Sequence, residues 1–137
     1  MNTEQQAVEH LLNQFALHAD RQDAQALAEL FLEQGCLAMA GVELDGAVAI
    51  ADFCRQRFQG GKRMTRHAWS NLHIERLSPA ELASTIVQIT YEHVSDEAAM
   101  QVRVNDVADR FRLDADGQWR FARREIRRVL SFSGPVA

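Results

Sequence analysis

The chain has 137 residues, of which 47% are hydrophobic and 25% charged, and its formal net charge is −4. These values are typical of a single globular domain over residues 1–137 with a sizeable core. The negative net charge gives no reason to expect nucleic acid or an anionic membrane as a partner. No apolar stretch approaches the ~20 residues that cross a bilayer.

The first segment of the chain is predicted to be an amphipathic helix. Thr3 followed by Gln6 is a capping-box pattern, which is typical of a helix start. Apolar residues then recur at helical spacing and form one stripe: Val8, Leu11, Leu12, Phe15, Ala16 and Ala19. Asp20 falls just beyond the edge of this stripe, where its carboxylate can face either a pocket or water.

Two further helices and a hairpin are predicted in the rest of the N-terminal half. Asp23 is typical of the N-cap of a second helix over residues 24–32, which ends at Gly35. Residues 36–46 indicate a short hairpin. Residues 47–58 are predicted to form a third amphipathic helix, because a pair of glycines follows the apolar pattern.

The C-terminal half is predicted to form long strands. Four segments, at about residues 64–77, 83–94, 98–113 and 118–131, are joined by short turn-like linkers such as SPAE and DADG. Consecutive long strands with short connections favour an antiparallel meander, and helices placed before them favour an α+β fold. The helices are then the only available cover for one face of the sheet.

The alternation of apolar residues changes phase within two of these strands. In residues 64–77 the bulky apolar side chains move from odd to even positions, and in residues 98–113 from even to odd. A change of phase inside a strand indicates a bulge or a strong bend. The sequence therefore predicts a curled sheet that can enclose a pocket between itself and the helices.

His67 is the strand residue best suited to proton transfer. An imidazole whose ordinary pKa is ~6.5 can act as a general base when a carboxylate binds one ring nitrogen and leaves the other free. Asp20 can supply that carboxylate if the first helix lies across the sheet. The alternative for both residues is structural, namely an exposed or hydrogen-bonded histidine beside Trp69 and a solvated aspartate.

Other kinds of site have weak support. None of the five histidines falls in HxH or HExxH spacing and no cysteine cluster accompanies them, so no metal site is expected. The chain also has neither a Gly-rich phosphate loop nor a GxSxG motif. The first residues, MNTEQQAVEHLL, lack the cationic start and apolar run of a signal peptide. We therefore expect a cytoplasmic protein in which Cys36 and Cys54 are free thiols.

The basic segment RFARREIRR, residues 120–128, distributes its arginines over both faces of a strand. They therefore do not form one continuous patch for nucleic acid, which would also need interleaved aromatic residues. Ion pairs with acidic residues of a neighbouring strand, such as Asp106 and Asp109, are the expected role.

Three segments taken in order resemble a known family. HADRQDAQALAELF at residues 18–31, RHAWSNLHIE at 66–75 and DADGQWRFARREI at 114–126 resemble signatures of the SnoaL-like proteins. These proteins belong to the nuclear-transport-factor-2-like, or cystatin-like α+β, superfamily. The resemblance implies a curved antiparallel sheet wrapped around three N-terminal helices, which forms a cone with an internal apolar pocket.

Within that superfamily the chain most resembles scytalone dehydratase and the bile-acid 7α-dehydratases. Both place an aspartate at the end of the first helix and a histidine on the strand after the third helix, and Asp20 and His67 match those positions. The bile-acid enzymes carry a carbonyl-polarising tyrosine where this chain has Phe15, which can form no such hydrogen bond. Tyr91 can replace it only if its side chain points inward.

The resemblance implies a cofactor-independent lyase or isomerase for a small hydrophobic cyclic ketone or alcohol, with His67 and Asp20 as the acid–base pair. Dehydration, isomerisation and cyclisation remain open. The expected pocket residues are aromatic or large and apolar: Phe15, Phe31, Met39, Phe53, Trp69 and Tyr91. The alternative is a non-catalytic protein, either a ligand binder or an assembly subunit like the β subunits of ring-hydroxylating dioxygenases. A homodimer through the sheet is also expected from the resemblance.

Overall fold

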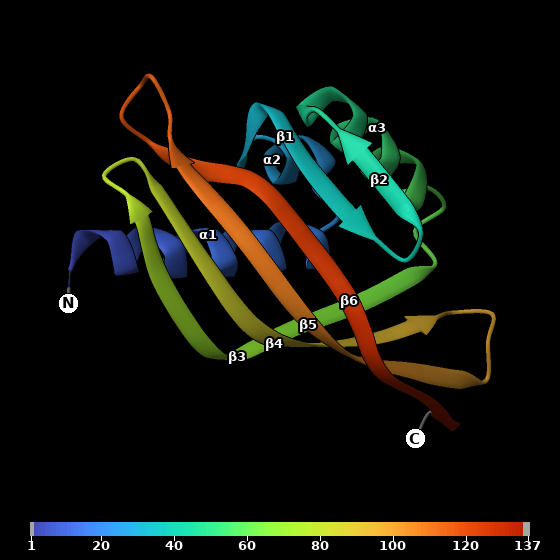
Figure 1. Ribbon diagram of the computed structural model, residues 1–137. Helices are drawn as coiled ribbons and strands as arrows, with labels where there is room; N and C mark the ends of the chain where they lie inside the picture. Colours follow the sequence, from blue (N-terminus) through green and yellow to red (C-terminus); the bar gives the residue numbers. More distant parts are fainter. Residues whose placement is uncertain (1, 136–137) are drawn as a thin grey trace.

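The structure is a computed structural model that describes residues 2–135. The described residues form three helices and a six-stranded sheet, so the predicted α+β class is confirmed (Figure 1). The elements in chain order are α1 (Thr3–Asp20), α2 (Ala24–Ala28), β1 (Phe31–Met39), β2 (Val42–Asp45), α3 (Ala47–Phe58), β3 (Arg63–Ser78), β4 (Glu81–Val94), β5 (Ala99–Leu113) and β6 (Trp119–Pro135). Within residues 2–135, no helix combines the length and apolar character needed to cross a membrane.

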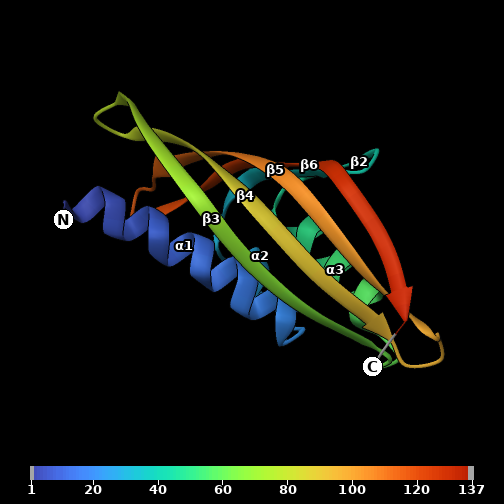
Figure 2. The ribbon, with the colours of Figure 1, turned by 90° about the horizontal axis from the view of Figure 1, so that it is seen from below.

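The sheet has the strand order β2-β1-β6-β5-β4-β3. The four long strands β3 to β6 form the predicted antiparallel meander, whereas β1 joins the far edge of β6 in parallel. The sheet is curved and does not close. All three helices lie on its concave side, with α1 running along β3 (Figure 2).

The first helix begins one residue earlier than the capping-box pattern predicts. Asn2 is the N-cap, because its side chain accepts a hydrogen bond from the backbone N–H of Gln5 at 2.6 Å. Thr3 is already inside the helix, so the predicted capping box of Thr3 and Gln6 is wrong. Asparagine is among the best N-cap residues, which explains the choice. Asp20 is the last helical residue, as the pattern indicates.

The second helix is shorter than predicted. α2 begins after the predicted N-cap but ends at Ala28, and the residues from Phe31 onward form β1. Phe31 lies opposite Phe121 of β6, and both side chains are buried in the core. Gly35 permits this close approach, because a Cβ there would lie 3.0 Å from the carbonyl oxygens of Leu32 and Phe121. Such tertiary packing overrides a weak local preference for helix.

The predicted hairpin and third helix are both present. β1 and β2 are joined by a tight turn at Ala40 and Gly41, whose φ angles of 40° and 80° are the positive values that two-residue hairpin turns need. α3 occupies the predicted residues 47–58 and begins after Gly46.

The predicted bulge is present in β3 but not in β5. Between Ser70 and His73 the pairing of β3 with β4 shifts by one residue. In β5 the odd-numbered residues from 103 to 111 all face the helices, and Val102 lies on the outer face. The register of β5 with β6 does shift twice, but the extra residues, Val129 and Ala122, both belong to β6. The prediction for residues 98–113 therefore mistook apolar residues of the outer face for a change of phase.

The core lies between the three helices and the concave face of the sheet. The predicted stripe of α1 contributes Val8, Leu11, Leu12, Phe15 and Ala19, all buried. Four phenylalanine rings form its centre, with neighbouring centroids 5.0 to 6.4 Å apart: Phe15, Phe31, Phe111 and Phe121. This packing fixes α1 against the sheet, and its C-terminal end consequently reaches the start of β3.

Candidate functional site

Asp20 and His67 meet where the end of α1 crosses β3. The Asp20 Oδ1 atom is 2.6 Å from His67 Nδ1, and Oδ2 accepts the backbone N–H of the same histidine at 3.0 Å. Thr65 Oγ1 donates to Asp20 Oδ1 at 3.0 Å. The carboxylate is thereby held by three contacts to one strand, and both side chains of the pair are only 14% exposed.

The position of Asp20 is not explained by helix stability. A carboxylate at the C-terminal end of a helix opposes the helix dipole, yet Asp20 is the final residue of α1. The chain then turns at Gln22, whose side chain donates to the backbone carbonyl of Arg63 at 2.7 Å. This bond ties the turn after α1 to β3, so the carboxylate is directed at the sheet.

The surroundings of His67 favour the neutral imidazole. Burial lowers the pKa of His67 below its ordinary value, and the positive charges of Arg124 and Arg103 act in the same direction. The hydrogen bond and negative charge of Asp20 oppose these effects without overcoming them. Since Nδ1 donates to a carboxylate, Nε2 is the nitrogen that carries the free lone pair. The histidine is thus prepared to accept a proton near neutral pH.

His67 forms part of the wall of a cavity of about 450 Å³ between the helices and the concave face of the sheet. This volume lies within the range of small-molecule sites. Much of the wall is apolar: Phe15, Ala19, Leu27, Leu37, Met39, Ala40, Val42, Phe53, Phe58 and Ile126. Polar uncharged side chains lie mainly on the sheet side: Thr65, Gln88, Thr90 and Asn105.

Three of the six predicted pocket residues line this cavity, namely Phe15, Met39 and Phe53. The other three do not. Phe31 is only 3% exposed and packs in the aromatic core. Trp69 shares the inward face of β3, but α1 covers it and its indole N–H donates to Asn13 Oδ1 at 2.9 Å.

Tyr91 is on the wrong face of the sheet to enter the cavity. Its side chain is 42% exposed on the outer face, while its neighbours Thr90 and Glu92 are buried on the inner one. The prediction that it lines the pocket is wrong, because successive side chains of a strand point to opposite faces. Tyr91 therefore cannot replace the tyrosine that is absent at Phe15.

A charged cluster at one end of the cavity was not predicted. Glu92 is 5% exposed and accepts hydrogen bonds from Arg63 and, at 2.5 Å, from Arg103. Burial opposes ionisation of Glu92, but the bonds from Arg103 and Arg63 outweigh it and lower the pKa of the carboxyl. The sequence carries one signal for this inner face, because Gln88, Thr90 and Glu92 alternate with apolar residues along β4.

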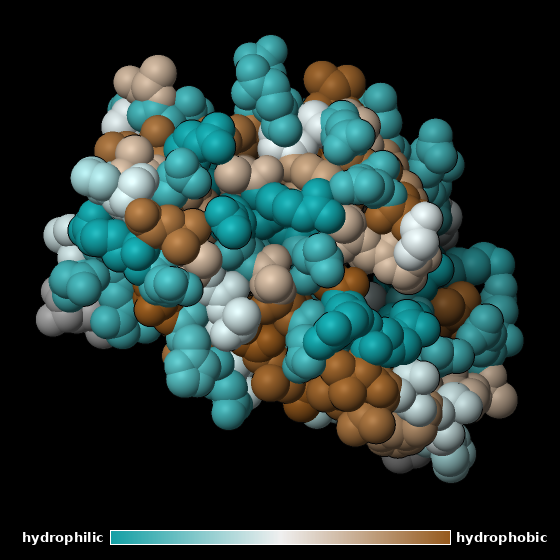
Figure 3. Space-filling model, viewed as in Figure 1, coloured by the Kyte–Doolittle hydropathy of each residue, from teal (hydrophilic) through white to brown (hydrophobic). Residues whose placement is uncertain are grey.

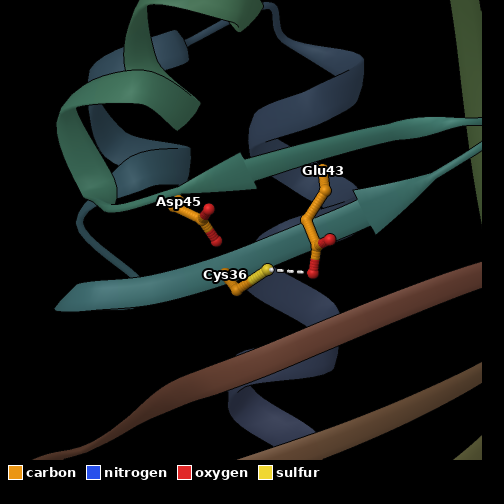
Figure 4. Close-up of side chains that lie close together, drawn as sticks. All are labelled: Cys36, Glu43 and Asp45. Carbon is orange, nitrogen blue, oxygen red and sulfur yellow. Dashed lines mark hydrogen bonds between the residues drawn. The ribbon is translucent and has the colours of Figure 1, made fainter.

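A second group of potential ligands lies away from the cavity, on the β1–β2 hairpin. The ligand atoms of Cys36, Glu43 and Asp45 lie within 4.8 Å of one another (Figure 4). However, Arg123 Nη1 is 2.8 Å from Glu43 Oε1 and 3.1 Å from Cys36 Sγ. Burial raises the pKa of the Cys36 thiol to about 11. Arg123 thus already occupies Glu43 and the cysteine sulfur, and we interpret this group as an ion pair beside a protonated thiol.

The family model described as the SnoaL-like domain matches residues 3–125. The chain belongs to the SnoaL-like family. Among curated proteins, none matches the sequence.

Solved structures agree with this membership in the SnoaL-like family. A proposed scytalone dehydratase from Novosphingobium aromaticivorans is 25% identical with a TM-score of 0.86, over 98% of this chain and 89% of that one. The hexachlorocyclohexane dehydrochlorinase LinA type 2 is 15% identical with a TM-score of 0.82, over 98% and 89% of the two chains. An NTF2-like protein with a cystatin-like fold from N. aromaticivorans is 24% identical with a TM-score of 0.74, over 89% and 79%. The predicted cone fold is thereby confirmed.

Proposed function

We propose that this SnoaL-like protein is a cofactor-independent lyase or isomerase that acts on a small, largely apolar cyclic ketone or alcohol. The observation that carries the proposal is the 2.6 Å contact between Asp20 Oδ1 and His67 Nδ1 at the wall of an apolar cavity. SnoaL-like membership and likeness to a proposed scytalone dehydratase and to LinA support a lyase or isomerase type.

His67 is the general base of the proposed reaction. Its Nε2 atom takes a proton from the carbon next to the substrate carbonyl, and the imidazolium that forms is stabilised by the Asp20 carboxylate. The same nitrogen then returns the proton. Delivery to another carbon completes an isomerisation, whereas delivery to a departing β-hydroxyl completes a dehydration.

Gln88 and Asn105 are proposed to stabilise the negative charge that develops on the substrate oxygen. Both side chains line the cavity, and they are 2% and 6% exposed. They lie side by side on β4 and β5, because the two residues are paired in register. Each amide has two N–H donors, so together they supply the hydrogen bonds that Phe15 cannot. Loss of one such donor typically lowers kcat by about 10²–10³-fold.

The proposal is tested by proton exchange, which requires no knowledge of the natural substrate. Cyclic ketones such as 2-tetralone are incubated in D₂O, and loss of the proton signal next to the carbonyl is followed by NMR. The wild-type protein is expected to accelerate exchange for at least one ketone, and His67→Ala to reduce that rate by about 10²-fold or more. His73→Ala is the matched control, because His73 lies on the exposed outer face of the same strand. Equal rates for His67→Ala and His73→Ala would reject His67 as the base.

A homodimer through the outer face of the sheet is part of the same proposal. Apolar side chains gather on that face near the C-terminal end of β6 (Figure 3). Tyr91, Leu130 and Phe132 are 42%, 63% and 63% exposed there. Burial of such a patch favours association. Light scattering is expected to give twice the chain mass for the wild-type protein and the monomer mass for Leu130→Glu. Val48→Glu is the control and is expected to stay dimeric, because Val48 is an apolar residue that is 75% exposed on α3, away from the sheet. A monomeric wild-type protein would contradict the expectation.

A further inference from the structure

Three arginines from three different elements converge on one end of the cavity. Arg57 comes from α3, Arg63 from β3 and Arg103 from β5, and all three line both the cavity and a shallower depression outside it. They therefore lie where the two adjoin, and we call this boundary the mouth of the cavity. A fourth, Arg128 of β6, lies on the cavity wall beside Asn105.

The acidic side chains present do not balance this charge. Glu92 is the one carboxylate among the described residues that line the cavity, which leaves a surplus of three positive charges. Glu97 lines the outer depression but not the cavity. The surplus is local, because the chain as a whole has a formal net charge of −4. A partly closed cavity concentrates such a field on whatever enters it.

Arg57 has hydrogen-bonding capacity left for a ligand. Glu92 is already engaged by Arg63 and Arg103, and Arg57 Nη2 lies 3.7 Å from Glu92 Oε2, which is too far for a hydrogen bond. Burial, and then the nearby charges of Arg63 and Arg103, lower the pKa of Arg57. An anion bound at this mouth would relieve that repulsion.

The register of the sheet places these arginines at a defined distance from the base. His67, Thr90 and Arg103 are paired across β3, β4 and β5, so Arg103 lies two strands from His67, or about 10 Å. Glu92 is paired with Thr65 and is the next inward-facing residue after Thr90 on β4, a step of about 7 Å along the strand. The backbone positions of Arg103 and Glu92 thus lie within about 10 Å of that of His67, a span comparable with a fused two-ring system.

We propose that the substrate is an apolar ring compound that carries a carboxylate, which binds Arg57 and Arg103 at the mouth of the cavity while the ring reaches His67. This inference rests on the proposed function and adds the chemical class of its substrate. A carboxylate fits the guanidinium groups because its two oxygens match their paired N–H donors. The apolar wall around Phe53 and Met39 receives the ring.

The test measures binding of unreactive probes, so that it does not depend on catalysis. 2-Naphthoate, its neutral amide 2-naphthamide and 2-naphthyl phosphate are titrated against the full-length protein, with probe fluorescence or calorimetry as the readout. 2-Naphthoate is expected to bind at least about tenfold more tightly than 2-naphthamide, as a charge-assisted interaction requires. Its affinity is expected to decrease as the salt concentration rises.

Arg57→Gln is the variant that decides the assignment, because Glu92 keeps its bonds from Arg63 and Arg103 in that protein. It is expected to weaken 2-naphthoate about tenfold and to leave 2-naphthamide unchanged. Arg55→Gln is the matched control on the same helix, since Arg55 pairs with Asp52 on the surface and does not line the cavity.

Four results would overturn the proposal: equal binding of 2-naphthoate and 2-naphthamide, tighter binding of the phosphate, equal effects of the two arginine variants, or no binding of 2-naphthoate. His67→Ala separates this inference from the proposed function. Retained 2-naphthoate binding in that variant alongside unchanged proton exchange would reject the base and leave the carboxylate site intact. If His67→Ala instead loses proton exchange as expected but the wild-type protein does not prefer 2-naphthoate, the carboxylate site is rejected and the role of His67 is retained.

Discussion

The substitution Asp20→Asn tests the central contact of the site with almost no change of shape. Asp20 accepts hydrogen bonds from Thr65 Oγ1 and from the backbone N–H and ring nitrogen of His67, at 3.0, 3.0 and 2.6 Å. An asparagine oxygen can accept some of these bonds, but its NH₂ group can accept none. The variant therefore loses the negative charge, and its NH₂ group faces at least one of the N–H or O–H groups that donate to Asp20 in the wild-type protein.

The expected loss of activity follows from the charge that His67 acquires in the reaction. An imidazolium and a carboxylate whose charge centres are about 4 Å apart attract each other by about 4 kcal/mol at an effective dielectric constant of about 20. Because about 1.4 kcal/mol corresponds to a tenfold change in rate, the exchange rate or kcat is expected to decrease by about 10³-fold. The free energy of unfolding is expected to decrease by about 1–3 kcal/mol through the lost hydrogen bonds.

Two measurements examine this prediction separately. Turnover or deuterium exchange gives the kinetic effect, and NMR titration gives the pKa of His67. Asp20 raises that pKa against the effect of burial, so the pKa is expected to fall further in Asp20→Asn. Asp23→Asn is the control, because Asp23 caps α2 at the surface and asparagine caps a helix equally well. An Asp20→Asn protein within tenfold of wild-type activity, or a His67 pKa that rises, would refute the reasoning.

Three further predictions concern titration and buried charge. Burial places the pKa of His67 below ~6.5. The kcat/KM is therefore expected to rise with pH up to the pKa of His67 and to be level above pH ~7, whereas a continued rise above pH ~8 would assign the base to another group. Burial raises the pKa of Cys36 and Cys54 to about 11, so iodoacetamide is expected to label the native protein much more slowly than the unfolded protein at pH ~7.5, and equal rates would contradict their burial. Asp109 and Arg124 are almost fully buried, with Asp109 Oδ1 and Arg124 Nε 3.7 Å apart. Arg124→Met is therefore expected to lower the free energy of unfolding in urea by ~3–5 kcal/mol, and the additional substitution Asp109→Leu is expected to recover most of this loss. A double variant no more stable than Arg124→Met would contradict this account of the buried pair.

The expected pairing of the basic segment is present in the structure. Arg127 lies 3.4 Å from Asp106 on the outer face, and Arg124 lies 3.7 Å from Asp109 on the inner one. The two pairs differ in consequence. The exposed pair is screened by solvent and stabilises the fold little, whereas the buried pair is sensitive to the loss of either partner. The sequence indicates both pairings, but only the tertiary structure shows which of them is buried.

The local patterns of the sequence are sufficient to predict most elements, whereas the pairing of Asp20 with His67 also required the family resemblance. The strand predicted for residues 83–94 is observed as Glu81–Val94, and the predicted N-cap Asp23 accepts its hydrogen bond from Ala26. These features depend on side-chain period and capping, which act within a few residues of the chain. Asp20 lies at a helix end and His67 in a strand, each beside an apolar pattern. The family resemblance then relates these two positions to each other.

Tertiary structure alone decided that the strand begins at Phe31, within the predicted second helix, that Tyr91 points outward and that arginines gather at the cavity mouth. Phe31 became part of a strand because it pairs with Phe121, ninety residues along the chain. Arg57 and Arg103 lie on different elements, and nothing local relates their positions. A period of 2 or 3.6 residues determines that a strand or helix has an apolar and a polar face. Which faces of different elements come into contact depends on the register and curvature of the whole sheet.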